Sequence, residues 1–211
     1  MNLDGTKNIN INKLFPQLPE VLVLSLSNCE INVLNALQKL ALLPKIRQIN
    51  LSENFCDISI SRFSTISSKL RRIEVNKVRW MEGSLISFFE NIGSIQELSI
   101  SYIDTEEESE WTNLFSALNS FNNFSLEELN WNGNKTNVEF FSFIKKCPGL
   151  ISLSLNHIFS INDLSTFHLL LSFFDDCHKS FTKLCIEGND KTFLGLESVH
   201  LIQTLKKNNI L

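Results

Sequence analysis

The side chains best suited to chemistry in this 211-residue chain are five cysteines and four histidines. A zinc site needs three or four thiolate, imidazole or carboxylate ligands that converge, usually from closely spaced pairs. Cys177 and His178 are adjacent, so their side chains diverge, and the other cysteines are far apart. The seven glycines are also dispersed, whereas a phosphate-binding loop needs them close together. The sequence therefore predicts no metal site and no cofactor.

Nucleophilic catalysis lacks support as well. No serine lies in a G-x-S-x-G sequence, and His168, His178 and His200 fall in helix-like segments without a matched carboxylate and nucleophile. We therefore expect a protein that is not an enzyme.

Residues suited to binding another protein are easier to find. Tyrosine and arginine are enriched at protein interfaces, and Tyr102 with Arg72 is the best candidate for an anchor. The predicted protein-binding residues are Gln48, Arg72, Glu74, Lys77, Glu97, Tyr102, Glu128 and His157. Alternatively, the opposite charges in this set pair with one another and have no binding role.

A repeated phrase of nine residues predicts the elements that position these side chains. It reads apolar-x-x-apolar-x-apolar-x-x-Asn or a substitute, and we number its positions 1 to 9. It begins at Val21, Ile46, Leu70, Ile95, Leu126, Leu150 and Phe181. Differences between successive starts are 25, 24, 25, 31, 24 and 31 residues, a spacing within or just beyond that of leucine-rich repeats.

Each phrase predicts one short strand, because apolar residues at positions 4 and 6 alternate with polar ones. Between phrases, apolar residues recur at helical spacing in 34–41, 85–92, 114–121, 138–144, 167–174 and 199–205. The predicted fold class is therefore α/β, a solenoid of about seven repeats with a curved parallel sheet on its concave side and helices on its convex side. We expect residues 1–211 to form a single domain, with the variable positions of the phrases on the concave face.

Several residues outside the strands also have predicted roles. Asparagine at position 9, as in Asn54, Asn134 and Asn189, should bond to backbone groups of the turn after each strand. Most aromatic rings should fill the core, whereas Trp80 and Trp111 fall in convex loops and should be partly exposed. The acidic run Glu106 to Glu108, with Glu110, is interpreted as a solvated loop or a helix first turn, or alternatively as a surface that steers a basic partner.

Composition narrows the range of partners. The net charge of -4 gives no basic surface of the kind that nucleic acids require, and no stretch is apolar and long enough to span a membrane. The odd, scattered cysteines suggest reduced thiols in the cytoplasm. Leu3 and Leu211 continue the phrase register outward, so we expect a fragment of a longer repeat array, whose open ends would allow oligomerisation.

Residues 18 to 211 resemble the leucine-rich repeats of the ribonuclease-inhibitor type, which are cytosolic and have helical convex sides. The ending Leu184-Cys-Ile-Glu-Gly-Asn189, followed by Leu201-Ile-Gln-Thr-Leu205, is similar to repeats of tropomodulin and of the CARMIL actin-regulatory scaffolds. The sequence departs from the family pattern in its two long repeats and in the aliphatic residues at several ninth positions.

This resemblance implies three hypotheses of function. The first is a non-catalytic scaffold that binds a protein on its concave face, in actin-cytoskeleton regulation. The second is a GTPase activator of the Ran type, acting on a small GTPase, although no residue here matches its catalytic group. The third is a ligand-sensing module of an intracellular receptor.

Overall fold

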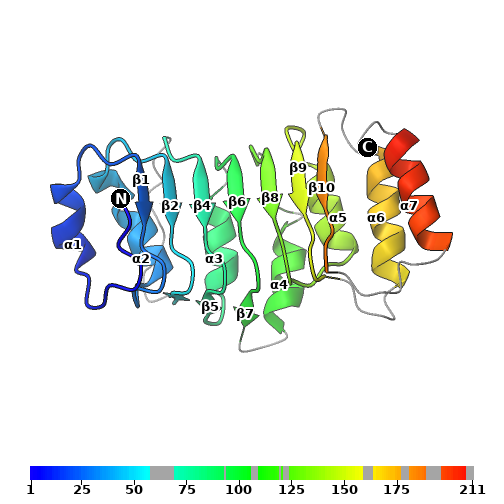
Figure 1. Cartoon of the computed structure of the whole chain (residues 1–211). Helices are drawn as coiled ribbons and strands as arrows, with labels where there is room; N and C mark the ends of the chain where they lie inside the picture. Colours follow the sequence, from blue (N-terminus) through cyan, green and yellow to red (C-terminus); the bar gives the residue numbers. More distant parts are fainter. Residues whose placement is uncertain are drawn as a thin grey trace.

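Seven short parallel strands lie side by side in one sheet, in chain order. The structure is a computed structural model, which describes residues 1–57, 69–92, 94–105, 109–118, 120, 124–158, 164–176, 181–188 and 196–207. The sheet runs from the N-terminal to the C-terminal side of the molecule (Figure 1). Its strands are β1 (Val23–Ser25), β2 (Gln48–Asn50), β4 (Arg72–Glu74), β6 (Glu97–Ser99), β8 (Glu128–Asn130), β9 (Ser152–Ser154) and β10 (Lys183–Cys185).

Pairing between these strands aligns equivalent positions of successive phrases. Position 3 of each phrase pairs with position 3 of the next, as Gln48 does with Arg72, and positions 4 and 5 pair in the same way. The fourth residues of the first six phrases, such as Leu24 and Ile49, are buried, and Leu184 in the seventh is half-buried against the core, so every strand turns the same face to the core.

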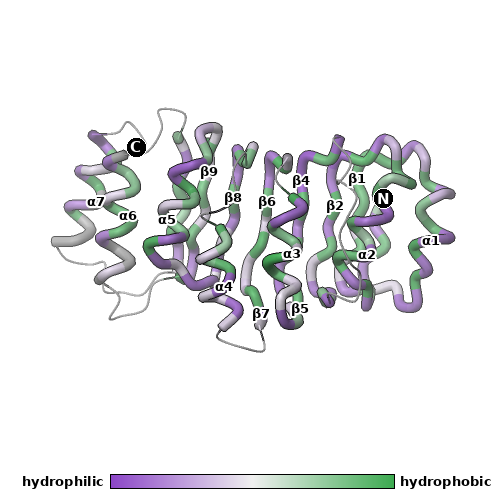
Figure 2. The backbone as a smooth tube through the Cα atoms, turned by 180° about the vertical axis from the view of Figure 1, so that it is seen from behind, coloured by the Kyte–Doolittle hydropathy of each residue, from purple (hydrophilic) through white to green (hydrophobic). Residues whose placement is uncertain are grey.

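Helices cover one face of the sheet (Figure 2). All six segments with helical spacing contain a helix: α2 (Val33–Gln38), α3 (Ser84–Asn91), α4 (Ser109–Leu118), α5 (Val138–Lys145), α6 (Leu164–Asp176) and α7 (Leu196–Lys207). Asn32 and Asn137 begin α2 and α5, where their side chains accept hydrogen bonds from backbone amides of the first turn. Each repeat contributes a parallel strand, and in six of the seven repeats a helix follows it within the described residues, which confirms the predicted α/β leucine-rich repeat solenoid.

A second, smaller sheet lies on the chain path between strands and helices, and the sequence analysis did not predict it. Its strands are β3 (Phe55–Cys56), β5 (Arg79–Trp80) and β7 (Asp104–Thr105), paired in parallel. Each has two residues, which is too short for an alternating pattern to be recognised.

The expected exposure of Trp80 and Trp111 is wrong, because both side chains are buried. Trp80 is in β5 and fully buried, with its ring centroid 5.2 Å from that of Phe88. Trp111 is in α4 and also buried, 6.2 Å from the ring of Trp131. Both indoles fill space between the strands and the helices, where large rings bury the most apolar area.

Two of the three ninth-position asparagines, Asn54 and Asn134, have the predicted role. Asn54 is buried, and its Oδ1 accepts from the amides of Cys29 and Ile31, both at 3.0 Å. Its Nδ2 donates to the carbonyl of Leu26 at 2.8 Å and to that of Leu51 at 2.9 Å. The amide therefore links two successive turns and satisfies backbone groups that the interior would otherwise leave unpaired.

Asn134 forms the same kind of link, since it accepts from the Ile103 amide at 2.8 Å and donates to the Ile100 carbonyl at 2.7 Å. Asn189 and the run Glu106 to Glu108 lie outside the described residues. Glu110 is in the first turn of α4 and is buried. Its Oε1 accepts a hydrogen bond from the Gly83 amide at 2.7 Å.

The first residues of the chain continue the solenoid. Asn2 bridges to Ser25 in parallel, and the amide of Leu3 donates to the Ser25 carbonyl at 2.9 Å. Leu3 therefore occupies position 6 of a further, partial phrase, as its sequence register predicts. A short helix, α1 (Ile11–Leu14), and a 3-10 turn (Phe15–Gln17) follow and bury Ile11 and Phe15.

Candidate protein-binding surface

The face of the seven-stranded sheet that points away from the helices, here called the strand face, carries the variable positions of the phrases. In-register pairing arranges them in straight rows across the strands. The third-position row contains Val23, Gln48, Arg72, Glu97, Glu128, Ser152 and Lys183. The fifth-position row contains Ser25, Asn50, Glu74, Ser99, Asn130, Ser154 and Cys185.

Charges in the middle of the strand face pair with one another. Arg72 Nε lies 2.9 Å from Glu74 Oε1, and its Nη1 lies 3.1 Å from Glu97 Oε2. Burial acts to lower the pKa of Arg72, but the charges and hydrogen bonds of Glu74 and Glu97 outweigh it and leave the pKa raised. The pairing foreseen as an alternative to binding is therefore present in the structure.

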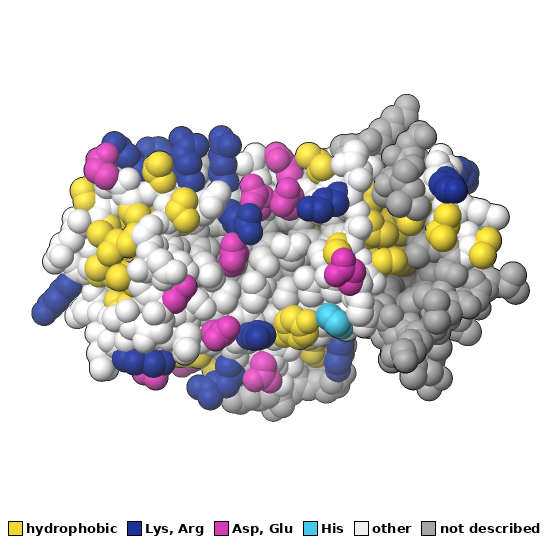
Figure 3. All heavy atoms as spheres, viewed as in Figure 1, with side chains coloured by type: hydrophobic (Ala, Val, Ile, Leu, Met, Phe, Trp, Pro, Cys, Tyr) yellow, Lys and Arg dark blue, Asp and Glu magenta, His cyan; other side chains and the backbone are white. Residues whose placement is uncertain are grey.

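The central charges do not cancel. Glu128 is exposed, stands opposite Glu97 in the next strand and forms no ion pair among the described residues. Arg72 thus pairs with two carboxylates, and Glu128 adds a third negative charge to the same row of the strand face. This part of the strand face has a surplus of negative charge (Figure 3).

Every eighth position of the phrase has a left-handed backbone. The φ angles of these residues lie between 54° and 67°. In the first six phrases the amide at this position donates to the carbonyl at position 7 of the next phrase, as that of Tyr102 does to Asn132 at 2.8 Å. The row is a continuous rim where the chain leaves the strands, formed by Asn28, Glu53, Lys77, Tyr102, Gly133, His157 and Gly188.

Tyr102 lies over the glycine of the following repeat. A Cβ atom at Gly133 would be 2.3 Å from Tyr102 Cδ1 and 2.4 Å from Cε1, closer than any real contact. Gly133 is therefore needed both for its φ of 67° and for the room it leaves to the ring. Tyr102 is 43% exposed, so its ring packs against Gly133 on one side and is open to solvent on the other.

His157 repeats this arrangement one phrase further on. A Cβ atom at Gly188 would be 1.9 Å from His157 Cε1, and His157 Nδ1 is 3.0 Å from the Gly188 carbonyl oxygen. The Tyr102 and His157 ring centroids are 6.4 Å apart. We call these two rings and the two glycines beneath them the ring ledge; an imidazole beside hydrophobic side chains is visible at the lower rim of the strand face (Figure 3).

The structure divides the eight predicted binding residues between the rows. Positions 3 and 5 hold Gln48, Arg72, Glu74, Glu97 and Glu128, and position 8 holds Lys77, Tyr102 and His157. Arg72 and Tyr102, expected to act together, lie in different rows and contact different neighbours: Arg72 contacts carboxylates and Tyr102 contacts Gly133 and His157.

Gly133 and Gly188 were missed as parts of the surface. A glycine at position 8 directly after a tyrosine or histidine at position 8 of the preceding phrase was the available signal.

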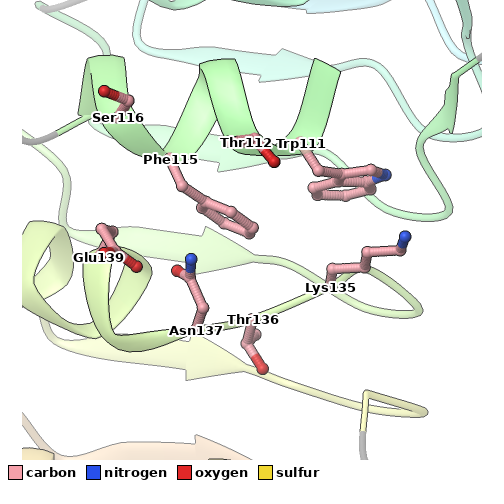
Figure 4. Close-up of a pocket in the computed structure, with 8 residues that line it drawn as sticks. All are labelled: Trp111, Thr112, Phe115, Ser116, Lys135, Thr136, Asn137 and Glu139. Atoms are coloured by element: carbon pink, nitrogen blue, oxygen red, sulfur yellow. The ribbon is translucent and has the colours of Figure 1, made fainter. Parts of the chain in front are cut away.

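A hollow lies away from the strand face, between α4 and the start of α5 (Figure 4). Its volume is about 530 Å³, and the rings of Trp111 and Phe115 point into it from α4. Two of its polar groups already have partners: Lys135 Nζ lies 5.9 Å from the Trp111 ring centre, and Asn137 caps α5. These contacts stabilise the join between two repeats.

The described residues contain no group of three or more His, Cys, Asp and Glu side chains that could hold a metal ion. Among the same residues, no helix combines the length and the apolar character needed to cross a membrane.

Comparison with known proteins gives likeness of fold only. No protein-family model matches the sequence, and no curated protein matches it. Among solved structures, the chain is similar to the leucine-rich repeat-containing protein LegL7 from Legionella pneumophila, with 17% identity and a TM-score of 0.47 over 99% of this chain and 79% of that one.

Two internalins from Listeria monocytogenes are also similar. Internalin inlF has 15% identity and a TM-score of 0.42 over 80% of this chain and 48% of its own. Internalin C2 has 18% identity and a TM-score of 0.36 over 76% of this chain and 71% of its own. The assignment to a leucine-rich repeat fold therefore rests on the repeat geometry of the chain itself.

Proposed function

We propose that the chain is a non-catalytic protein-interaction module that binds a partner protein on the strand face. The ring ledge carries this proposal. Tyr102 exposes 43% of its surface although Gly133 and His157 fix its ring from below and from one side. An aromatic ring already held in place loses little conformational entropy on binding, which is the property of a good interface anchor.

The charges in the middle of the strand face indicate which partner surface fits. Glu128 has no ion pair among the described residues, and Glu74 and Glu97 share a single arginine. A partner segment with a lysine or arginine would complement these carboxylates, and its apolar or aromatic side chain would cover Tyr102. Lys77 and Gln48 border the same area and complete the predicted set of contacts.

The cellular setting is a further part of the proposal. Cys29, Cys56, Cys147 and Cys185 are free thiols, which supports a reducing compartment such as the cytoplasm. A role in actin regulation, and the ribonuclease-inhibitor subclass, rest on the sequence resemblance alone.

Affinity capture with matched variants tests the proposal. The wild-type protein, the Tyr102→Ala/His157→Ala variant and an Asn113→Ala control on the exposed side of α4 are immobilised, and retained proteins are quantified by mass spectrometry. We expect at least one protein to be retained equally by the wild type and the control, and its retained amount to be about tenfold lower with the double variant. Equal retention by all three would reject the strand face as the binding surface.

A further inference from the structure

Four cationic side chains gather at the edge where the chain enters strands β2 and β4. Lys45 and Arg47 flank the start of the second phrase, and Lys69 and Arg71 occupy the same two places in the third. The Arg71 amide donates to the Arg47 carbonyl at 2.8 Å, so the two arginines are direct neighbours on adjacent strands. All four side chains are exposed, and they form a basic rim on the N-terminal side of the strand face (Figure 3). We call them the basic edge.

The two arginines of the basic edge are not neutralised. Lys45 Nζ pairs with Glu20 Oε2 at 2.5 Å, and Lys69 Nζ donates to the Pro44 carbonyl at 3.0 Å. In the described part of the chain, Arg47 and Arg71 form no ion pair. The carboxylates on β4 and β6, those of Glu74 and Glu97, already pair with Arg72.

Exposed apolar side chains adjoin the basic edge. Leu22 and Val23 are consecutive, yet they are 49% and 48% exposed. The Leu22 carbonyl accepts from the amides of Arg47 at 2.8 Å and Gln48 at 3.1 Å, which places Leu22 beside Arg47 on the next strand. Leu22, Arg47 and Arg71 therefore form one row across three adjacent repeats, apolar at one end and cationic at the other.

We propose that this row is a second docking surface, which binds an acidic segment of a partner protein that also carries an apolar residue. Adjacent strands are about 4.8 Å apart, so the row is about 10 Å long, the span of three or four extended residues. Two neighbouring guanidinium groups can bind one carboxylate pair through bidentate hydrogen bonds. An apolar side chain two or three residues further along the segment would then cover Leu22 and Val23.

An extended polyanion fits this surface less well than a peptide. The basic edge covers only two repeats, Glu20 stands within it, and Glu97 and Glu128 follow on the next strands. A nucleic acid or an anionic membrane would contact these carboxylates as well and be repelled, whereas a short segment would not. The surface is also independent of the ring ledge, which lies at the opposite rim and in later repeats.

Selection from a phage-displayed random peptide library tests the proposal. The baits are the wild-type protein, the Arg47→Gln/Arg71→Gln variant and a Lys146→Gln/Lys206→Gln control, which removes the same charge from exposed helix-side positions. We expect the wild type and the control to enrich peptides with Asp or Glu close to Leu, Ile or Phe, and the arginine variant to lose them. A synthetic copy of an enriched peptide should bind at least about tenfold more weakly to the arginine variant, measured by fluorescence anisotropy.

The Leu22→Ser/Val23→Ser variant keeps the charges and should bind the same peptide severalfold more weakly. Far-UV circular dichroism checks that each exposed substitution leaves the fold intact. Three results would overturn the proposal: no acidic enrichment, equal enrichment by the arginine variant, or equal loss with the lysine control. A fourth is sedimentation of the wild type, but not of the arginine variant, with phosphatidylserine vesicles in the absence of acidic peptide enrichment, since that would assign the edge to a membrane.

Discussion

Tyr102 lies across Gly133, thirty-one positions later in the chain, and its ring occupies the space that any Cβ atom at Gly133 would need. The same relationship between His157 and Gly188 shows that it is a feature of the repeat and not of one turn. Because position 8 is left-handed in every phrase, glycine is favoured there on backbone grounds alone. The rings make glycine necessary at these two positions.

Gly133→Ala should therefore destabilise the protein through two separable effects. The left-handed backbone alone costs about 1 kcal/mol, and displacing the Tyr102 ring should raise the total to roughly 2–3 kcal/mol. In a Tyr102→Ala background the ring is absent, and the loss should fall back to about 1 kcal/mol. Urea denaturation of the four proteins in this cycle measures both terms; additive losses would mean that the ring and the glycine are not in contact.

Asn54 should contribute to stability through the backbone groups that its side-chain amide satisfies. Asn54→Ala leaves the amides of Cys29 and Ile31 without this acceptor, at about 1–3 kcal/mol each. Asn54→Leu restores the side-chain volume but supplies no acceptor, so it should lose about as much stability in equilibrium denaturation. A leucine variant as stable as the wild type would contradict the hydrogen-bond account and favour a simple packing role.

Charge pairing on the strand face should add little to stability. Arg72 and its two partners are each roughly one-third exposed, and such pairs contribute at most about 1 kcal/mol. Arg72→Gln should therefore shift the free energy of unfolding by less than about 1 kcal/mol. A loss of several kcal/mol in a denaturant titration would mean that these charges serve the fold, and would weaken their assignment to a binding surface.

Among the cysteines that the structure describes, the buried thiols should react far more slowly than Cys185. Burial raises the pKa of Cys56 and of Cys147 to about 12, so both stay protonated at pH 8 in the native state, whereas Cys185 is partly exposed. Iodoacetamide should label Cys185 before Cys56 and Cys147, as peptide mass spectrometry would show. Early labelling of Cys56 or Cys147 in native protein would contradict the packing described.

The raised pKa values of Cys56 and Cys147 also determine how the stability of the protein changes at alkaline pH. The two thiols ionise near their ordinary pKa of 9.0 when unfolded but near 12 when folded. Above pH 9 the unfolded chain releases protons that the folded chain retains, so stability should fall as the pH rises from about 9 to 12. Replacing both cysteines by alanine should flatten this part of the pH profile of unfolding.

The phrase made the large sheet, the helices and the asparagine links predictable, because each depends on a pattern that recurs within one repeat. Leu24 and Leu26 mark a strand with one buried face, and Asn54 marks its turn. The second sheet and the ring ledge were not predictable in the same way. Trp80 in β5 depends on pairing with Cys56 and Thr105, and Tyr102 on a glycine one repeat away, and such contacts are visible only when the repeats are stacked.

The central claim, that the strand face binds a partner protein, is tested most directly by site-specific photo-cross-linking. Benzoylphenylalanine is placed at Tyr102, Glu128 and, on the helix side, Asn113, and each protein is irradiated in a lysate of cells that express it. Our account predicts that positions 102 and 128 cross-link to the same protein and that position 113 does not. Cross-linking of that protein from position 113 alone would contradict it.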